Sequence, residues 1–228
     1  MENLKLLKKN KILIIAAHPD DEMLGCGGTI IKLKEKNEIN VVFLTNGISA
    51  RTINKKNAKL RKNECLNLFK DLNLPKPIML NFSDNQLDKI PLLKIIKKIE
   101  LIIKKIQPNI IFTHYENCLN IDHQITYRAT ITACRPLKTN PVKTILCFEV
   151  LSSTDWAIFE KKSFQPNLYI NITKQINNKL KFLKYYKSEI KKYPHSRSLK
   201  ALEALAKIRG TSSGYNFAEA FYLVRHLD

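Results

Sequence analysis

The chain has 228 residues, of which 44% are hydrophobic and 26% are charged, a composition typical of a soluble globular domain with a substantial core. Its five cysteines include no C-x-x-C pair, which argues against a disulfide framework or a cysteine zinc site. No apolar run is long enough to span a membrane, and the basic N-terminal segment is not followed by a signal-peptide pattern, so we expect a cytoplasmic protein.

The formal net charge is +19, because 39 basic residues outnumber 20 acidic ones. Such an excess is found in proteins that bind nucleic acid, anionic membranes or phosphorylated substrates. Only seven of the basic residues are arginine, however, and runs of lysine usually mark solvated faces. We therefore expect no specific nucleic-acid partner. A non-enzymatic polyanion-binding module is the alternative from a different class of function.

Apolar runs alternate with amphipathic stretches over the first 150 residues. Runs of branched residues predict buried strands, and apolar residues spaced three and four apart predict helices. This alternation predicts a Rossmann-like α/β fold, a single domain over residues 1–228 with a mostly parallel sheet and helices on both faces. The predicted strands are 11–17, 39–47, 77–82, 109–115 and 144–150, and the predicted helices are 24–36, 57–72, 91–106 and 122–135.

The last third of the chain has a different pattern. It contains an extended piece at 165–172, a lysine-rich helix at 173–192, a helix at 198–209 and a loop at 209–214. The stretch AEAFYLVRH follows near the end. No repeat or linker marks a domain boundary.

The stretch AAHPDDE places one histidine and three acidic residues directly after the first predicted strand. In parallel sheets, ligands bind at the edge where the strands end. Pro19 turns the chain there, so that His18 and Asp21 converge on one point. A divalent cation at that point would relieve the repulsion between the carboxylates. Asp20 points the other way and is a candidate general base.

A third ligand must come from another segment. The stretch THYENCLNIDHQ, residues 113–124, follows a strand that ends at the same edge of the sheet. His123 is its best candidate, with Asp122 as an orienting acid. The alternative is that Asp122 is a helix N-cap and His123 an ordinary residue of the first helical turn.

The glycines of GCGG, residues 25–28, do not have the G-x-G-x-x-G spacing of a dinucleotide site. The acidic turn before them would also repel a pyrophosphate. This disfavours a nucleotide-dependent oxidoreductase. We expect these glycines to let the first helix pack close to the sheet.

Six segments, AAHPDDEMLGCGGTI, LTNG, NIDH, LSSTDW, PHSRS and AEAF, resemble the LmbE-like, or PIG-L, family of N-acetylglucosaminyl deacetylases. The later segments are similar to a bacterial branch associated with surface-polysaccharide sugars. The resemblance implies a hydrolase that removes acetyl from an N-acetylated amino sugar, free or linked to a nucleotide or lipid. An amidase acting on a different amide is the alternative within this class. Family members often assemble, so a homo-oligomer is also left open.

The resemblance further implies that His18, Asp21 and His123 bind a divalent metal, usually Zn²⁺, and that Asp20 is the general base acting on the attacking water. Three protein ligands with an open position suit catalytic zinc. Two histidines and one carboxylate also suit Fe²⁺.

The chain departs from the family at the donor for the tetrahedral oxyanion. Many members have a histidine three residues before the third ligand, where this chain has Asn120. His195, in YPHSRS, is a candidate for the missing imidazole, or else it caps local backbone. Arg51 is a candidate for binding a sugar hydroxyl, carboxylate or phosphate, or else a solvated loop residue. Cys118 stands where relatives often have an acid, and the sequence assigns it no role.

Overall fold

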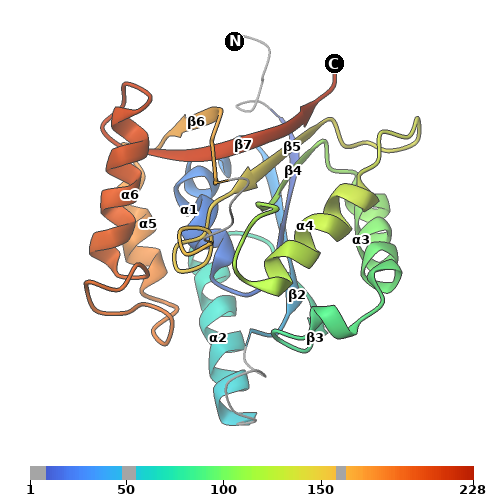
Figure 1. The fold of residues 1–228 in the computed structure, drawn as a ribbon, viewed down its shortest axis with the longest axis horizontal. Coiled ribbons are helices and arrows are strands. Elements are labelled where there is room, and N and C mark those ends of the chain that lie inside the picture. The colour runs from blue at the N-terminus through green and yellow to red at the C-terminus, as the bar shows by residue number, and fades with distance from the viewer. Residues whose placement is uncertain (1–8, 48–54, 158–162) are drawn as a thin grey trace.

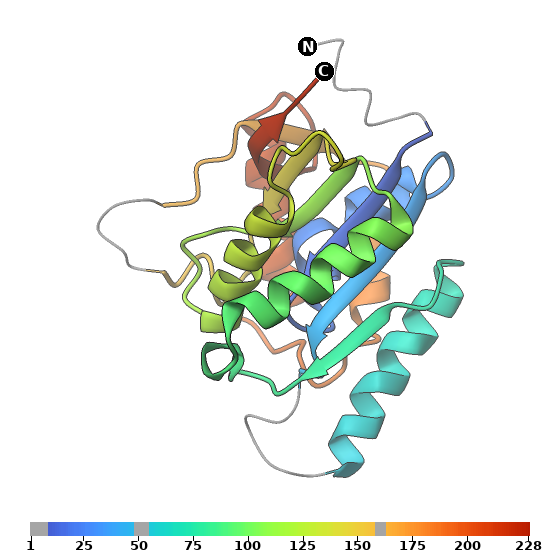
Figure 2. The ribbon, with the colours of Figure 1, turned by 90° about the vertical axis from the view of Figure 1, so that its right-hand side faces the viewer.

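The computed structural model describes residues 9–47, 55–157 and 163–228. These residues form one sheet with helices on both faces (Figures 1 and 2). The strands are β1 (Lys11–Ala16), β2 (Glu38–Thr45), β3 (Ile78–Phe82), β4 (Ile110–His114), β5 (Thr144–Phe148), β6 (Leu168–Asn171) and β7 (Ala218–His226). The helices are α1 (Asp21–Leu33), α2 (Lys55–Asp71), α3 (Leu92–Ile106), α4 (Ile121–Ala133), α5 (Ile176–Leu183) and α6 (Leu199–Thr211), with a short 3₁₀ helix, η1, at Leu87–Lys89.

Each central strand is buried on both faces, which is why these strands are continuous apolar runs in the sequence. In β1, Ile12 and Ile14 pack into the core that also contains residues of α1, α2, α5 and α6. Leu13 and Ile15 pack into the second core, under α3 and α4. Figure 1 shows α3 and α4 on one side of the sheet and α1, α5 and α6 on the other. The expected mostly parallel sheet covered on both faces is confirmed.

The order of the strands is β3-β2-β1-β4-β5-β7-β6. β1 pairs in parallel with β2 on one side and with β4 on the other. The chain therefore adds β2 and β3 on one side of β1 and then crosses back to add β4 on the other side of β1. In such sheets this reversal opens a crevice at the carboxyl ends of the two strands, where ligands bind.

The C-terminal region departs from the sequence expectation. The stretch AEAFYLVRH forms β7, which runs antiparallel between β5 and β6. The lysine-rich helix expected over 173–192 ends at Leu183, and the following residues form turns up to the start of α6. Tertiary contacts of these turns override the helical spacing. α6 in turn continues to Thr211, into the loop expected at 209–214.

The glycines of α1 allow a close approach to the sheet, as expected. A Cβ atom on Gly25 would lie 2.3 Å from a ring carbon of Phe148 in β5. The helix is also interrupted at Cys26, whose φ of −141° is not helical. The buried carboxylate of Glu219 in β7 accepts the backbone N–H of Gly28 at 2.8 Å, which satisfies a donor freed by the interruption.

No helix among the described residues combines the length and the apolar character needed to cross a bilayer.

Candidate active site

The turn between β1 and α1 holds the acidic motif in a strained conformation. Asp20 has a φ of 122°, a region that residues other than glycine rarely adopt and that typically costs about 1–3 kcal/mol. Buried contacts hold the turn in place. The side chain of Glu22 accepts the backbone N–H of Asp20 at 2.9 Å, and the guanidinium of Arg61 donates to the carbonyl of Pro19 at 2.6 Å. Strain that is enforced in this way is typical of functional sites.

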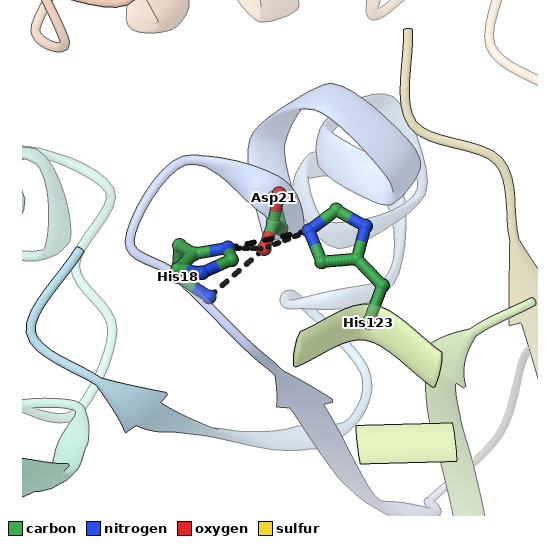
Figure 3. Close-up of side chains that lie close together, drawn as sticks. All are labelled: His18, Asp21 and His123. Atoms are coloured by element: carbon green, nitrogen blue, oxygen red, sulfur yellow. Dashed lines mark hydrogen bonds and ion pairs between the residues drawn. The ribbon is translucent and has the colours of Figure 1, made fainter. Parts of the chain in front are cut away.

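Three side-chain atoms converge beside this turn (Figure 3). Nδ1 of His18 lies 3.1 Å from Oδ2 of Asp21 and 3.2 Å from Nε2 of His123. Nε2 of His123 lies 3.3 Å from the same Asp21 oxygen. All three residues are buried. His18 and Asp21 come from the end of β1 and the start of α1, and His123 comes from the first turn of α4, across the crevice.

This triangle fits a small divalent cation. Ligand atoms about 2.0–2.1 Å from one tetrahedral ion lie about 3.3 Å apart, close to the three separations observed. The other carboxylate oxygen of Asp21, Oδ1, is buried and has no hydrogen-bond partner within the protein. A fully buried carboxylate oxygen without a partner is rare and calls for one. The donor set of two imidazole nitrogens and one carboxylate suits Zn²⁺ and Fe²⁺.

At Asp21 and His123 the electrostatics favour the protonation states that metal ligands require. Burial disfavours the charge on Asp21, but His123 and His114 outweigh it and hold the pKa of this carboxyl well below its usual range. Burial lowers the pKa of His123 to about 3, so its ring is neutral at physiological pH. The site therefore presents one carboxylate and one unprotonated imidazole nitrogen.

The second ring nitrogen of His18 faces two carboxylates. Nε2 lies 3.0 Å from Oδ1 of Asp84 and 3.1 Å from Oδ2 of Asp122. Burial lowers the pKa of His18, but hydrogen bonds to Asp122, Asp21 and Asp84 raise it well above the usual value. Positive charge is thus favoured at this position. A metal at Nδ1 would replace the proton on that nitrogen, while the proton on Nε2 stays shared with the two acids.

The orienting acid Asp122 therefore contacts His18, and not the adjacent His123 for which it was expected. The backbone N–H of Asn85 and that of Leu87 donate to the Asp122 carboxylate at 2.7 and 3.0 Å. The alternative assignment of Asp122 as the helix N-cap is wrong. The cap of α4 is Asn120, whose Oδ1 accepts from the backbone N–H of Asp122 at 2.8 Å.

His114 supports His123 from the end of β4. The two rings stack with centroids 3.8 Å apart and an interplanar angle of 21°. Nε2 of His114 accepts the backbone N–H of Ala17 at 2.9 Å, which assigns the proton to Nδ1. The hydrogen bond to Ala17 thus fixes the His114 ring to the turn that carries His18, and the face of the ring packs against His123.

Asp20 lies outside the converging triangle, in an ion-pair network. Its Oδ1 lies 3.2 Å from a guanidinium nitrogen of Arg61, and its Oδ2 lies 3.0 Å from one of Arg197. Glu189 bridges the same two arginines, so the four side chains form a closed ring of alternating charge. Burial raises the pKa of Asp20 to about 6, although Arg61 and Arg197 lower it.

A cavity of about 260 Å³ opens beside this network. In it, Nδ1 of His195 accepts the backbone N–H of Arg197 at 3.0 Å, which leaves Nε2 as the ring nitrogen that carries a proton. The Asn120 side chain reaches the same cavity but also donates to Asn85 at 2.9 Å. Arg51, expected to bind substrate, lies outside the described residues. The lining of the cavity includes Asn120, Ser153, Trp156, Glu189, His195 and Arg197.

Sequence reasoning missed four residues of this site. Asp84 follows the third strand at the carboxyl edge, a position that could have marked it as a candidate. Arg61 and Glu189 lie in lysine-rich segments, where a charged residue looks like part of a solvated face. Arg197 lies in PHSRS, one of the segments that carry the family resemblance, and that position could have marked it as a candidate. Their burial depends on contacts between distant segments.

Comparison with known families decides the classification. The family model for PIG-L, described as GlcNAc-PI de-N-acetylase, matches residues 13–134, more than half of the chain and the part that contains His18, Asp21 and His123. The chain belongs to the PIG-L family. The resemblance expected from the acidic motif is thereby confirmed.

Relatives of this PIG-L family member are similar over most of their length. YaiS, an uncharacterized deacetylase of Escherichia coli K12, is 31% identical over 79% of this chain and 92% of its own. A probable N-acetyl-alpha-D-glucosaminyl L-malate deacetylase of Bacillus cereus is 26% identical over 78% of this chain and 83% of its own. The N,N'-diacetylchitobiose deacetylase of Pyrococcus horikoshii shares the fold, with a TM-score of 0.76, 24% identity and coverage of 95% and 84% of the two chains.

Proposed function

We propose that this protein is a metal-dependent deacetylase that removes the acetyl group from an N-acetylated amino sugar. The convergence of Nδ1 of His18, Oδ2 of Asp21 and Nε2 of His123 is the observation that carries the proposal. Membership of the PIG-L family and the deacetylases among its relatives supply the reaction class. These three residues would hold Zn²⁺, or Fe²⁺ as the alternative ion.

A divalent ion at this position supplies Lewis acidity toward the amide carbonyl and the attacking water. The chain supplies the proton transfers. Asp20, as general base, takes a proton from the water as its oxygen forms a bond to the acetyl carbon. The same carboxyl then gives the proton to the sugar nitrogen as the C–N bond breaks, so that acetate and a free amine result. A positioned acid–base group typically contributes about 10²–10⁴-fold in rate.

The arginine contacts orient this base. Both oxygens of Asp20 lie within ion-pair distance of guanidinium groups, from Arg61 and Arg197. Glu189 offsets the positive charge of the two arginines, so the carboxylate is oriented while the network as a whole stays near neutral. This matters because a lone carboxylate held by two unbalanced cations would be a weak base.

His195 is the proposed donor to the oxyanion of the tetrahedral transition state. Its Nε2 carries the ring proton, and the residue lines the cavity next to Arg197. Asn120 is the weaker candidate, because its Oδ1 caps α4 and its Nδ2 donates to Asn85. We propose that Asn120 contributes to binding through its position in the cavity lining.

The cavity suits one sugar ring. Its volume of about 260 Å³ is below the range of about 300–1,000 Å³ typical of pockets for drug-sized ligands. Trp156 lies at its margin with 45% of its surface exposed, and its ring centroid is 5.5 Å from that of His195. An exposed aromatic face beside polar hydroxyls is a platform for the apolar face of a sugar. A nucleotide or lipid carried by the sugar would have to lie outside this cavity.

A screen for loss of acetyl tests the proposal. Purified protein with added Zn²⁺ or Fe²⁺ is incubated with N-acetylated amino sugars and their nucleotide and lipid conjugates, and the products are read by mass spectrometry. We expect release of acetate from at least one compound. Asp20→Asn should slow this release by about 10²–10⁴-fold, whereas the matched change Asp88→Asn, at an exposed acid of η1, should not. Release of acetate from no compound of the panel would contradict the proposal and favour the amidase alternative instead.

A further inference from the structure

The side of His123 that faces away from the triangle contacts a thiol. Nδ1 of His123 lies 3.1 Å from Sγ of Cys118, and the hydroxyl of Ser153 is 3.4 Å from the same nitrogen. Sγ of Cys118 lies 2.9 Å from Ser153 Oγ and 3.4 Å from Thr154 Oγ1. All of these side chains are buried. Three segments therefore meet behind the ring: the loop after β4, the start of α4 and the turn after β5.

The protons of this cluster can be assigned from its geometry. A metal ligand at Nε2 requires the proton of His123 to sit on Nδ1, which then donates to Sγ of Cys118. Thr154 Oγ1 accepts the backbone N–H of Val150 at 2.9 Å, so its own hydrogen is available to Sγ. The thiol hydrogen of Cys118 is left for Ser153 Oγ, which also accepts the backbone N–H of Asn120. With these assignments the N–H of His123, the thiol of Cys118 and the hydroxyl of Thr154 each have an acceptor, and the cluster carries no charge.

In the two histidines of the triangle, the ring nitrogens that face away from it thus have different hydrogen-bond partners. His18 is backed by the carboxylates of Asp84 and Asp122. His123 is backed by a neutral sulfur and a hydroxyl. An acceptor behind a ligand histidine fixes its tautomer and its ring orientation, and removing such a partner typically costs about 10–100-fold in metal affinity.

We propose that Cys118 is a positioning residue, which holds the His123 ring so that Nε2 faces Asp21 and His18. The inference rests on the metal site of the proposed function. The role differs from that of the other buried cysteines, such as Cys134, which packs in the core under α3 and α4. Cys118 acts through His123 and does not touch the reacting atoms.

Metal affinity tests this assignment without reference to turnover. Zn²⁺ and Co²⁺ dissociation constants are measured by competition with a chromophoric chelator for the wild type, Cys118→Ala, Cys118→Ser and the matched control Cys134→Ala. We expect Cys118→Ala to weaken binding by about 10–100-fold and Cys118→Ser, which keeps an acceptor, to weaken it less. The control should bind as the wild type does. The visible spectrum of bound Co²⁺ should change in Cys118→Ala alone.

Circular dichroism establishes that each variant is folded, and Cys118→Ser carries the test if Cys118→Ala is not. Wild-type affinity together with an unchanged Co²⁺ spectrum in a folded Cys118→Ala protein would overturn the positioning role and leave the metal site intact. Equal loss in Cys118→Ala and Cys134→Ala would also overturn it, because general destabilisation would explain both. Absence of binding in the wild type would overturn the metal site itself, and the proposal with it.

Discussion

Nδ1 of His18 and Nε2 of His123 lie 3.2 Å apart, although 105 positions separate the two residues in the sequence. The same Asp21 oxygen lies 3.1 Å from the first nitrogen and 3.3 Å from the second. When both ring nitrogens are unprotonated, as metal ligands must be, their lone pairs repel each other and the carboxylate adds negative charge. A cation shared by all three atoms satisfies each of them.

Removal of one corner of this triangle should release the metal. We expect Asp21→Asn and His123→Ala to lower the metal content of purified protein sharply, because each removes a ligand atom. Asp20→Asn should retain the metal, because Asp20 lies in the arginine network outside the triangle. Elemental analysis of dialysed protein measures the outcome. Full occupancy in the ligand variants would exclude the site, and loss of metal in Asp20→Asn would make Asp20 a ligand.

The arginine network should set the acidic limb of the pH–rate profile. A general base works only when unprotonated, so kcat/KM should rise with pH through the Asp20 pKa of about 6. Arg197 lowers the pKa of Asp20, so a variant without the Arg197 guanidinium should have the acidic limb of its pH–rate profile at higher pH. We expect this shift for Arg197→Gln in kcat/KM measured from pH 5 to pH 9.

A suitable control is Arg225→Gln. Arg225 donates to the carbonyl of Cys134 at 2.6 Å and belongs to β7, so it should leave the limb where it is in the wild type. A limb that stays in place in Arg197→Gln, or moves to lower pH, would mean that Asp20 is not the group that titrates.

His195 and Asn120 are the two candidates for the oxyanion donor. Loss of the first should affect kcat, and loss of the second should affect stability. His195→Ala should lower kcat by about 10²–10³-fold with unchanged metal content, because a transition-state donor is lost. Asn120→Ala should mainly lower stability, by about 0.5–2 kcal/mol, because Asn120 caps α4. Steady-state kinetics and urea unfolding of the two variants separate these effects. Near wild-type kcat in His195→Ala with a large loss in Asn120→Ala would reverse the assignment.

Glu22 should make the protein less stable as pH rises. Burial raises the pKa of its carboxyl to about 8 in the folded protein, against an ordinary value of 4.5. The unfolded chain loses this proton near pH 4.5 and the folded chain near pH 8. The stabilisation by the protonated Glu22 side chain is therefore fully present below pH 4.5. Between pH 4.5 and pH 8 it is lost, and the free energy of unfolding falls by about 1.4 kcal/mol per pH unit.

Glu22→Gln should flatten this dependence. The amide is neutral at every pH, and its oxygen can still accept the backbone N–H of Asp20 that Glu22 accepts at 2.9 Å. Urea unfolding of both proteins from pH 5 to pH 8 gives the difference in slope. Parallel curves would show that Glu22 is ionised in the folded protein, in which case its contact with the Tyr186 hydroxyl, at 2.7 Å, stabilises the anion.

Much of the parallel sheet could be predicted because its signals are local. A strand buried on both faces must be apolar along its length, so 11–17 and 109–115 predict β1 and β4 to within one residue at each end. The turn after β1 was also predictable, because proline and three acids cannot continue a buried strand. β7 was not assigned, because an antiparallel strand inserted between β5 and β6 depends on a pairing of distant segments.

By itself, the sequence determined the parallel core, the acidic turn that carries His18, Asp20 and Asp21, and the resemblance that names the family. The tertiary structure alone decided what supports each of these residues. Asp84 and Cys118 contact His18 and His123 only because separate loops meet at the carboxyl edge of the sheet. Likewise, Arg61 reaches Asp20 from a segment in which charged residues look solvated, and Arg197 reaches it from a segment 177 positions away. The burial of a charge is set by what packs over it, and local sequence does not contain that information.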